Sequence, residues 1–399
     1  MSAKTKRRAS SGAKGLAGRF FDLLSSVGFS CVLLILLGLL TWLGTLEQVE
    51  FGLYEVQRKY FESFVLVHDW NGIPIPLPGA NLVMCLLFVN LVLGGMVRMR
   101  RDGSTVGILV THVGIALLLL SGFVKLYHSQ DGHVTLFETQ RANWFQSYVR
   151  WEVAVARRLP DGSLEEHLIP EEHFSQADGS EPARFASEAL PFALELSHVT
   201  PNCVPLPKGP MFEVDVPVID GVFLKAEPRK PEAEANVAGA YARLVPKDGG
   251  PSRTGILWGL DRGPWTVEAG GEVWAVDLRR ERYPMPFTLV LDDFRKEDHP
   301  RLSMARSFES DVTVLEHGAE RAVEISMNEP LRDQGLVLYQ ASWGPSNARP
   351  GDPLFSTFSV VRNPADRWPL IACIITALGL VVHFTRKLSR YIRVEARRS

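Results

Sequence analysis

Cysteine is scarce in this sequence, and its placement excludes two kinds of redox and haem protein. The chain has four cysteines among 399 residues, and no two of them form a C-x-x-C pair. Without that pair the chain is not a thiol–disulfide oxidoreductase of the paired-cysteine kind, and without C-x-x-C-H it is not a c-type cytochrome. Cys203 lies outside the long apolar runs, and we expect it to be a small buried side chain.

Motifs of independent catalysis are also missing. The sequence has no G-x-S-x-G, phosphate loop or H-E-x-x-H. Its acidic pairs, at 171–172 and 292–293, are adjacent residues, whose side chains point to opposite faces of a strand. His167 and His173 have no cysteine or aspartate cluster around them at metal-ligand spacing. We therefore predict no catalytic residue and interpret these groups as solvated surface.

Long apolar runs, by contrast, fill much of the first third of the chain and recur near its end. They cover about residues 27–46, 80–97, 106–124 and 368–384. Each run has about 18–20 residues, which is enough for a helix to cross a bilayer core. The predicted fold class is a membrane protein with four transmembrane α-helices, three N-terminal and one C-terminal, and a large mostly-β extracytoplasmic domain between helices 3 and 4.

Basic residues gather beside the apolar runs and set the predicted topology. Six precede Asp22, three lie in the loop 98–105, and six follow the fourth run. The segment 127–367 instead has 25 basic and 37 acidic residues, a net charge of −12. The positive-inside rule therefore predicts that both termini and the short loop are cytoplasmic and that the large domain lies outside.

These boundaries predict five segments. They are a basic cytoplasmic N-terminus (1–26), a three-helix membrane region (27–126), an extracytoplasmic β-rich domain (127–367), a fourth transmembrane helix (368–385) and a basic cytoplasmic tail (386–399). The first run is too long for a signal-peptide core and lacks a small-x-small cleavage pattern, so we interpret it as a retained anchor. Contacts with lipid headgroups explain the basic ends, so the predicted partners include the bilayer and no nucleic acid.

The loops of the membrane region are short. The loop 98–105 is so short that helices two and three must form an antiparallel hairpin. Gly94, Gly95, Gly107 and Gly114 would let the backbones of these two helices approach closely. The outer loop 47–79 is partly amphipathic and ends in a turn-rich stretch before the second helix.

The polar segment is predicted to be mostly β. Stretches of alternating polar and apolar residues are separated by Asp-Gly, Gly-Gly and Pro: 148–157, 164–169, 192–198, 221–226, 266–278, 287–291, 311–315, 323–327 and 336–339. Regular short strands favour an antiparallel sandwich or a barrel-like fold. The segment 225–236, rich in Glu, Pro and Ala, is a candidate linker between two subdomains.

Two histidines within the apolar runs are the candidate functional residues. His112 lies in the third run, six residues from its cytoplasmic end, or roughly 9 Å deep at about 1.5 Å per residue. His383 lies close to the cytoplasmic end of the fourth run. An imidazole kept neutral by an apolar medium has a lone pair for a metal, and ionisable residues within a span are functional candidates. The alternatives are a hydrogen bond from His112 to Asn90 or Thr111, and a headgroup-level position for His383.

Several short motifs, in order along the chain, resemble the ResB family of cytochrome c biogenesis proteins. They are SVGFS at 26–30, GTLEQ at 44–48, THVGI at 111–115, FTLVLDDF at 287–294, FESD at 308–311, MNEPL at 327–331 and GLVLYQAS at 335–342. The three-plus-one arrangement of the apolar runs also resembles that family. The segment 159–264 matches nothing in the family's pattern.

The resemblance implies a partner-dependent role in system II cytochrome c biogenesis. ResB-like proteins act with a multi-span partner of the ResC/CcsA type in the bacterial cytoplasmic (inner) membrane. Together they carry haem b outward and join it to the C-x-x-C-H thiols of apocytochrome c. The family's intramembrane histidine matches His112, which would be an axial ligand of the haem iron, with His383 as a weak candidate for a second ligand.

The resemblance also implies limits on what this chain does alone. The partner has a tryptophan-rich haem-binding segment, and this sequence has no W-G-x-x-W run. We therefore predict a non-catalytic or accessory subunit of a haem lyase (cytochrome c synthetase) complex. One alternative is a membrane-anchored periplasmic binding or scaffold module in which His112 only packs. A transporter or sensor subunit is another, although the scarcity of buried charge argues against an ion pathway.

Overall fold

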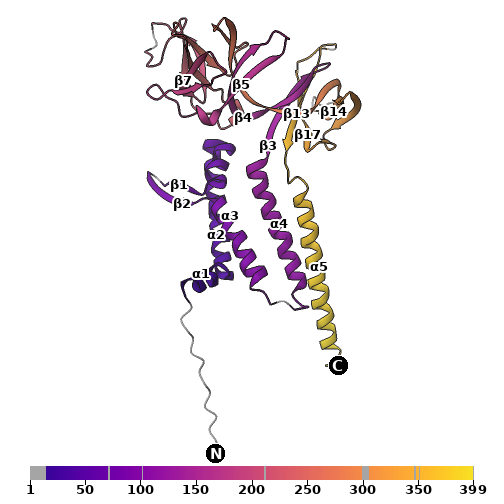
Figure 1. Cartoon of the computed structure of the whole chain (residues 1–399). Helices are drawn as coiled ribbons and strands as arrows, with labels where there is room; N and C mark the ends of the chain where they lie inside the picture. Colours follow the sequence, from indigo (N-terminus) through magenta and orange to yellow (C-terminus); the bar gives the residue numbers. More distant parts are fainter. Residues whose placement is uncertain are drawn as a thin grey trace, which may run out of the picture. The chain divides into compact units, whose positions relative to one another are not determined.

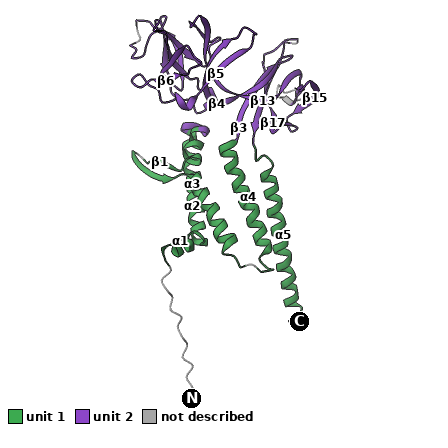
Figure 2. Cartoon of the chain, viewed as in Figure 1, with its two compact units in different colours: residues 1–49, 55–128, 364–399 green, residues 50–54, 129–363 purple. Residues whose placement is uncertain are grey.

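The computed structural model describes residues 15–70, 72–100, 102–210, 213–298, 305–345, 347–349 and 351–398. The chain forms two compact units, which Figure 2 colours separately. The helical unit comprises Met1–Val49, Glu55–His128 and Pro364–Ser399. The β unit comprises Glu50–Tyr54 and Ser129–Asn363.

Helices make up most of the helical unit (Figure 1). The α-helices are α1 (Leu16–Leu24), α2 (Val27–Val56), α3 (Ala80–Asn90), α4 (Val106–His128) and α5 (Trp368–Glu395). Two π-helices, η1 (Gln57–Glu62) and η2 (Leu91–Val97), extend α2 and α3. In the described residues four helical stretches are long and apolar enough to cross a membrane: Val27–Glu62, Ala80–Val97, Val106–His128 and Trp368–Glu395. The predicted set of four apolar helices is confirmed.

Three of these helices continue beyond the apolar runs that predicted them, α4 only to His128 and α2 and α5 further. The first run ends near residue 46, but α2 continues to Val56, with a break at Gly52, where φ is +79°. The fourth run ends at 384, but α5 continues to Glu395. Glu, Gln, Lys and Arg are good helix formers, so the polar residues that end a hydropathy signal do not end the helix. The short helix α1 was not predicted.

A small antiparallel hairpin stands between α2 and α3 in the sequence and projects from the helices in Figure 1. Its strands are β1 (Val65–Trp70) and β2 (Ile73–Pro78). Pro74, Pro76 and Pro78 have no N–H to donate. The residue pairs that contain a proline therefore cannot exchange two backbone hydrogen bonds. The pairs between them, such as His68 with Ile75, must be the hydrogen-bonded ones. The outer edge of β2 therefore has no backbone N–H donors at its prolines, so a further strand cannot pair fully with it. The segment expected to be turn-rich is thus a strand.

The β unit is antiparallel throughout its assigned strand pairs. Its largest sheet has ten strands, in the order β15-β14-β13-β4-β3-β18-β17-β16, with β12 beside β13 and β5 beside β4. A four-stranded sheet has the order β11-β10-β7-β6, and β8 pairs with β9. The strands are β3 (Gln130–Phe137), β4 (Arg141–Arg158), β5 (Leu164–Pro170), β6 (Ala183–Ala186), β7 (Phe192–Thr200), β8 (Cys203–Pro207), β9 (Val222–Ala226), β10 (Gly239–Pro246), β11 (Arg253–Trp258), β12 (Trp265–Ala269), β13 (Glu272–Asp298), β14 (Ala305–Glu316), β15 (Ala319–Ser326), β16 (Leu331–Asp333), β17 (Leu336–Gly344) and β18 (Phe355–Arg362). Two single 3-10 turns complete the unit, η3 (Glu171–His173) and η4 (Ala233–Ala235).

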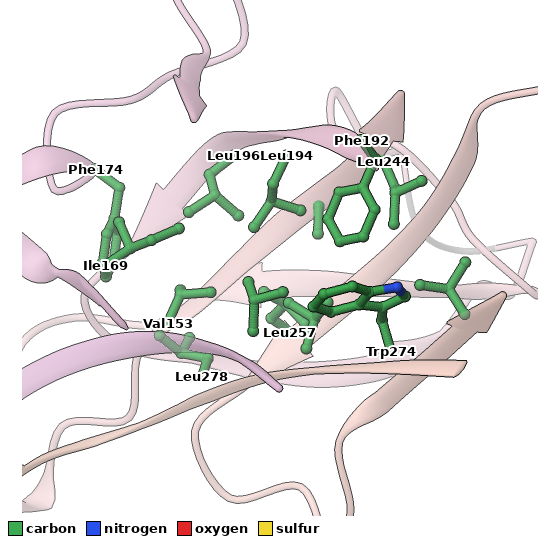
Figure 3. Packing of buried hydrophobic residues seen from close by; sticks show 14 of the residues in the cluster. Val153, Ile169, Phe174, Phe192, Leu194, Leu196, Leu244, Leu257, Trp274 and Leu278 are labelled. Atoms are coloured by element: carbon green, nitrogen blue, oxygen red, sulfur yellow. The ribbon is translucent and has the colours of Figure 1, made fainter. Parts of the chain in front are cut away.

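Two hydrophobic cores share the long strands β4 and β13. The first core contains Trp274, which packs edge-on against Phe192 with ring centroids 5.4 Å apart (Figure 3). The second core contains Phe145 and Phe358. On β13, even-numbered residues enter the first core and odd-numbered residues the second, and the register with β4 shifts between Arg280 and Arg282. One continuous strand thus serves both cores.

The predicted β-rich class is confirmed, although two details of the prediction are wrong. The stretch 266–278 is not one strand, because Gly270 and Gly271, with φ of +62° and +80°, form the turn between β12 and β13. The candidate linker 225–236 does not divide two subdomains. Residues from both sides of it, such as Leu196 and Leu244, enter the same core.

Candidate functional site in the helical unit

His112 lies on α4 with its ring against the end of the π-helix η2. Its Nδ1 is 2.8 Å from the carbonyl oxygen of Gly95. That carbonyl belongs to the last turn of η2, where C=O groups have no donor within the helix. A Cβ at position 95 would lie 2.7 Å from Nδ1. The imidazole therefore caps a helix end, and it fits there because residue 95 is glycine.

This hydrogen bond fixes the tautomer of His112. A carbonyl oxygen only accepts, so the proton of the neutral ring is on Nδ1 and the lone pair is on Nε2. Within the described ranges Nε2 makes no hydrogen bond. Metal-ligating histidines usually have this arrangement, with the remote N–H bound to a carbonyl or carboxylate. The ring is oriented by one nitrogen and free to bind with the other.

The hydrogen-bond partners expected for His112 are wrong, because both are used elsewhere. The side-chain amide of Asn90 donates to the carbonyl oxygens of Leu24 and Ser26, at 2.7 and 3.0 Å. The Thr111 hydroxyl donates to the carbonyl of Gly107, four residues earlier on the same helix. Asn90 thus ties the connection between α1 and α2 to α3, and Thr111 is satisfied within α4.

One free imidazole nitrogen suits haem iron better than it suits a bare metal ion. A bound ion is usually held by three or four protein ligands. Haem iron takes four nitrogens from the porphyrin and needs only one or two axial ligands from protein. The half-buried ring of His112, on a helix of apolar residues, fits that requirement.

His383 lies at a different contact. A Cβ at Gly107 of α4 would lie 2.5 Å from the backbone nitrogen of His383. The His383 Nδ1 is buried without a hydrogen-bond partner among the residues that the structure describes. No ring contact or hydrogen bond joins it to His112 in that part of the chain. His383 lies twelve residues before the end of α5, which continues to Glu395, and its headgroup-level position stays a prediction.

The helices α4 and α5 pack through small residues. A Cβ at Gly114 would lie 2.8 Å from the Ala372 carbonyl oxygen, and one at Gly379 would lie 2.5 Å from the Thr111 nitrogen. These are backbone approaches of the small-xxx-small kind. Gly107 and Gly114 were expected to face the second apolar helix, and the structure shows that they face α5 instead. Of the four glycines named for the predicted hairpin, Gly95 makes its contact across it, with His112.

A second polar cluster in the helical unit was missed by the sequence analysis. Glu47 accepts hydrogen bonds from Lys59 at 2.8 Å, from the Tyr60 hydroxyl at 2.7 Å and from His68 Nδ1 at 2.9 Å. Tyr60 is fully buried and His68 is 9% exposed. The alternation of β1, V-L-V-H-D-W, was the available signal, since it places His68 on the same face as the buried Leu66.

The model of the ResB-like family matches residues 99–352. This chain belongs to the ResB-like family. The matched range contains His112 and most of the β unit. The family suggested by the sequence motifs is thereby confirmed.

Two curated relatives share a shorter stretch. They are the proteins named cytochrome c biogenesis protein CcsB from Prochlorococcus marinus strains NATL1A and NATL2A. Each is 39% identical over 70 residues, which is 17% of this chain and 16% of the relative. The chain thus aligns with about a sixth of the length of the curated relatives it matches.

Within the family-matched range, Arg279 is at the centre of an ion-pair cluster of the β unit. Arg279 donates to Glu152 at 2.9 Å and to both oxygens of Glu166 at 2.9 and 3.0 Å. These hydrogen bonds lower the pKa of Glu166, whereas burial raises the pKa of Glu152.

Cys203 is buried, and burial raises the pKa of its thiol to about 12. The expectation of a small buried cysteine is confirmed.

Proposed function

We propose that this chain is a haem-handling subunit in cytochrome c biogenesis. Membership of the ResB-like family and the names of the two CcsB relatives support that role. Four apolar helices and the basic residues beside them support a multi-pass position in the bacterial cytoplasmic membrane. In this topology both termini are cytoplasmic and the β unit is outside.

The central step is ligation of haem iron by His112. The Nδ1–H of the ring is held by Gly95, and the lone pair of Nε2 is directed away from that bond. Because His112 is six residues from the start of α4, the iron would be held in the cytoplasmic half of the membrane, roughly 9 Å from the helix end at about 1.5 Å per residue. With its proton on Nδ1, the ring has the lone pair of Nε2 to donate to the iron.

The second axial ligand comes from a multi-span partner of the ResC/CcsA type. His383 is the weaker candidate, because its backbone packs against α4 at Gly107 and no contact among the described residues joins its ring to His112. A haem ligated by both polypeptides stabilises their association. In this proposal the chain is an accessory subunit of a haem lyase complex, and it binds haem b in transit.

The β unit positions apocytochrome c. Thioether formation adds a thiol across a haem vinyl group, so that a C–S bond forms and the thiol proton moves to carbon. Orientation by binding contributes much of the rate of such an addition. The β unit offers a ten-stranded antiparallel sheet with ion pairs such as those of Arg279, and the residues for the reacting haem would come from the partner.

The test is to replace His112 by asparagine in the full chain purified with its partner. The Nδ2 of asparagine is bonded to Cγ, as is the Nδ1 of histidine, so His112→Asn keeps a donor for Gly95 but has no atom in place of Nε2. We expect haem occupancy and cytochrome c yield to fall by more than about 10-fold, since even second-shell partners of metal ligands are worth about 10–100-fold.

The matched control is His173→Asn, at a histidine of the β unit whose side chain is 59% exposed. It should leave both haem occupancy and cytochrome c yield at the level of the unaltered protein. Full haem occupancy in the His112 variant would contradict the proposal. A complex that is colourless before any substitution would instead favour a periplasmic scaffold role without haem contact.

A further inference from the structure

The hairpin of β1 and β2 has one face that is apolar and largely exposed. Residues opposite each other in an antiparallel pair share a face, as do residues two apart on one strand. Val65 and Val67 of β1 therefore share this face with their partners on β2, Pro78 and Pro76. Val65 is 65% exposed and Val67 is 56% exposed. The core residue Leu66 is on the opposite face, which packs against the helical unit.

The tip of the hairpin is exposed and apolar as well. Trp70 at the end of β1 pairs with Ile73 at the start of β2, and the two are 52% and 63% exposed. From 64 to 78 the sequence has no lysine or arginine. Its one acidic side chain, Asp69, accepts a hydrogen bond from the backbone nitrogen of Gly72 in the turn. Exposed apolar surface of this kind marks a contact with a protein or with a membrane.

The two edges of the hairpin differ in their backbone groups. Residues outside the hydrogen-bonded pairs direct their N–H and C=O groups away from the partner strand. On β2 these residues have no N–H, since they are Pro74, Pro76 and Pro78. On β1 they each have an N–H, since they are Val65, Val67 and Asp69. Unsatisfied donors are costly in hydrocarbon, so the edge of β2 suits an apolar medium better than the edge of β1 does.

The base of the hairpin lies at the ends of two apolar helices. Gly79 alone separates the last residue of β2 from the first residue of α3. In the first turn of α3, the side-chain amide of Asn81 donates to the hydroxyl of Tyr127 at 2.6 Å, one residue before the end of α4. Figure 1 shows the hairpin projecting to the side of the helices. Its exposed residues are therefore near the level at which these two apolar helices end.

We propose that this hairpin is inserted into the outer leaflet of the membrane, where its open face and its tip contact lipid. The edge of β2 faces the acyl chains, and the N–H groups along β1 face the oxygen atoms of the headgroups. Trp70 lies between the two layers, where tryptophan is enriched. The inference uses the membrane position and topology of the proposed function, and it does not depend on haem binding.

A lipid surface fits these features better than a protein partner does. A protein strand added along β2 would find no N–H donor at the three prolines. Among the strand residues of the open face, Asp69 is the polar one, and its carboxylate is already bonded to Gly72. A specific protein contact needs polar groups that fix its orientation. Burial of apolar side chains among acyl chains is non-directional and needs none.

The experiment measures the contact of Trp70 with lipid by fluorescence quenching. The full chain is reconstituted in vesicles of phosphatidylcholine with brominated acyl chains, which quench a tryptophan that touches them. The emission of Trp70 is the difference between the unaltered protein and Trp70→Phe. Acrylamide added to vesicles of unbrominated phosphatidylcholine measures exposure to water. Trp42→Phe provides the matched control within an apolar helix, because Trp42 of α2 is 55% exposed.

We expect brominated lipid to quench the emission of Trp70 as strongly as that of Trp42, and acrylamide to quench it weakly. Val67→Asp places a charge on the open face, so less of the Trp70 emission should be lost in brominated lipid. Val218→Asp is the matched control, at a valine of the β unit that is 40% exposed. It should leave the quenching of Trp70 unchanged.

Each of the opposite results would overturn the inference. Quenching of Trp70 by acrylamide but not by brominated lipid would place the hairpin in water. Quenching by neither would show that protein covers the tip, such as a second copy of the chain. Equal quenching in Val67→Asp and the unaltered protein would show that the open face does not enter lipid. If brominated lipid quenched neither Trp70 nor Trp42, the membrane position in the proposed function would fail as well.

Discussion

The helix α4 uses two of its faces in different ways. Toward α5 it presents Gly107 and Gly114, and the two backbones approach so closely that added Cβ atoms would collide with backbone atoms. Toward η2 it presents His112, and the glycine is on the other helix, at Gly95. On the first face glycine makes room for a backbone, and on the second face it makes room for a ring.

This difference separates a packing contact from a binding contact. The α4–α5 face is complete without any ligand, because its groups are backbone atoms and small side chains. On the η2 face the hydrogen bond to Gly95 involves only Nδ1 of the imidazole. The other ring nitrogen, Nε2, has no protein partner among the described residues. Glycine alone therefore marks only close packing, and the proposed haem site rests on the oriented imidazole beside it.

The largest expected effect is on the packing face. Gly114→Leu should force α4 and α5 apart, since a Cβ there would lie 2.8 Å from the Ala372 carbonyl oxygen. Overpacking of this kind costs about 1–3 kcal/mol and occasionally more. We expect a large loss of folded protein, measured by size-exclusion chromatography and thermal unfolding in detergent. Gly122→Leu on the same helix is the control, because nothing lies within 4 Å of a Cβ at that position. Equal folding of the two variants would contradict the packing role.

An intermediate effect is expected on the binding face. Gly95→Ala places a Cβ 2.7 Å from His112 Nδ1, so the ring must move and its bond to the carbonyl must weaken. Folding should survive, while haem affinity should fall by about 10–100-fold, the usual effect of losing a second-shell partner. Hemin titration measures this, with Gly38→Ala as a control at an open position of α2. Unchanged haem affinity would show that the Gly95 contact does not orient a ligand.

The smallest effect on haem is expected at His383. His383→Leu removes a ring whose Nδ1 is buried without a partner in the described part of the chain. An unsatisfied buried polar group costs about 1–3 kcal/mol, so the variant should unfold at a higher temperature and retain its haem. The Soret intensity and the unfolding temperature are measured together. A lost Soret band would make His383 an iron ligand and abolish the contrast between the two faces.

Sequence patterns predicted the fold in segments where the residues are uniformly apolar or where polar and apolar residues alternate regularly. The four apolar runs and several of the alternating strands were found in this way, although β3 and β18 also alternate and were not predicted. The ends of α2 and α5 were not, because Glu47 and Arg386 lower hydropathy without opposing a helix. Strands β8, β10 and β11 were missed for a different reason. Their alternation is interrupted by proline, by small residues or by glycine, as in Cys203–Pro207 and Arg253–Trp258.

The candidate site was predicted as a residue but not as a geometry. An ionisable residue in an apolar run identifies His112. Nothing in the sequence indicates that Gly95, 17 residues earlier, supplies the acceptor, because that depends on where η2 ends. The Glu47–His68 cluster was missed because its members are 21 residues apart and belong to a segment expected to be a loop.

The most direct test of the central claim is rescue of a cavity variant by free imidazole. His112→Gly removes the whole ring and leaves space beside Gly95, which free imidazole can occupy as a ligand. The account predicts that the purified complex loses the Soret intensity that His112 supports and regains much of it when imidazole is added. A Soret band that is unchanged in His112→Gly before imidazole is added would contradict ligation of haem iron by this residue.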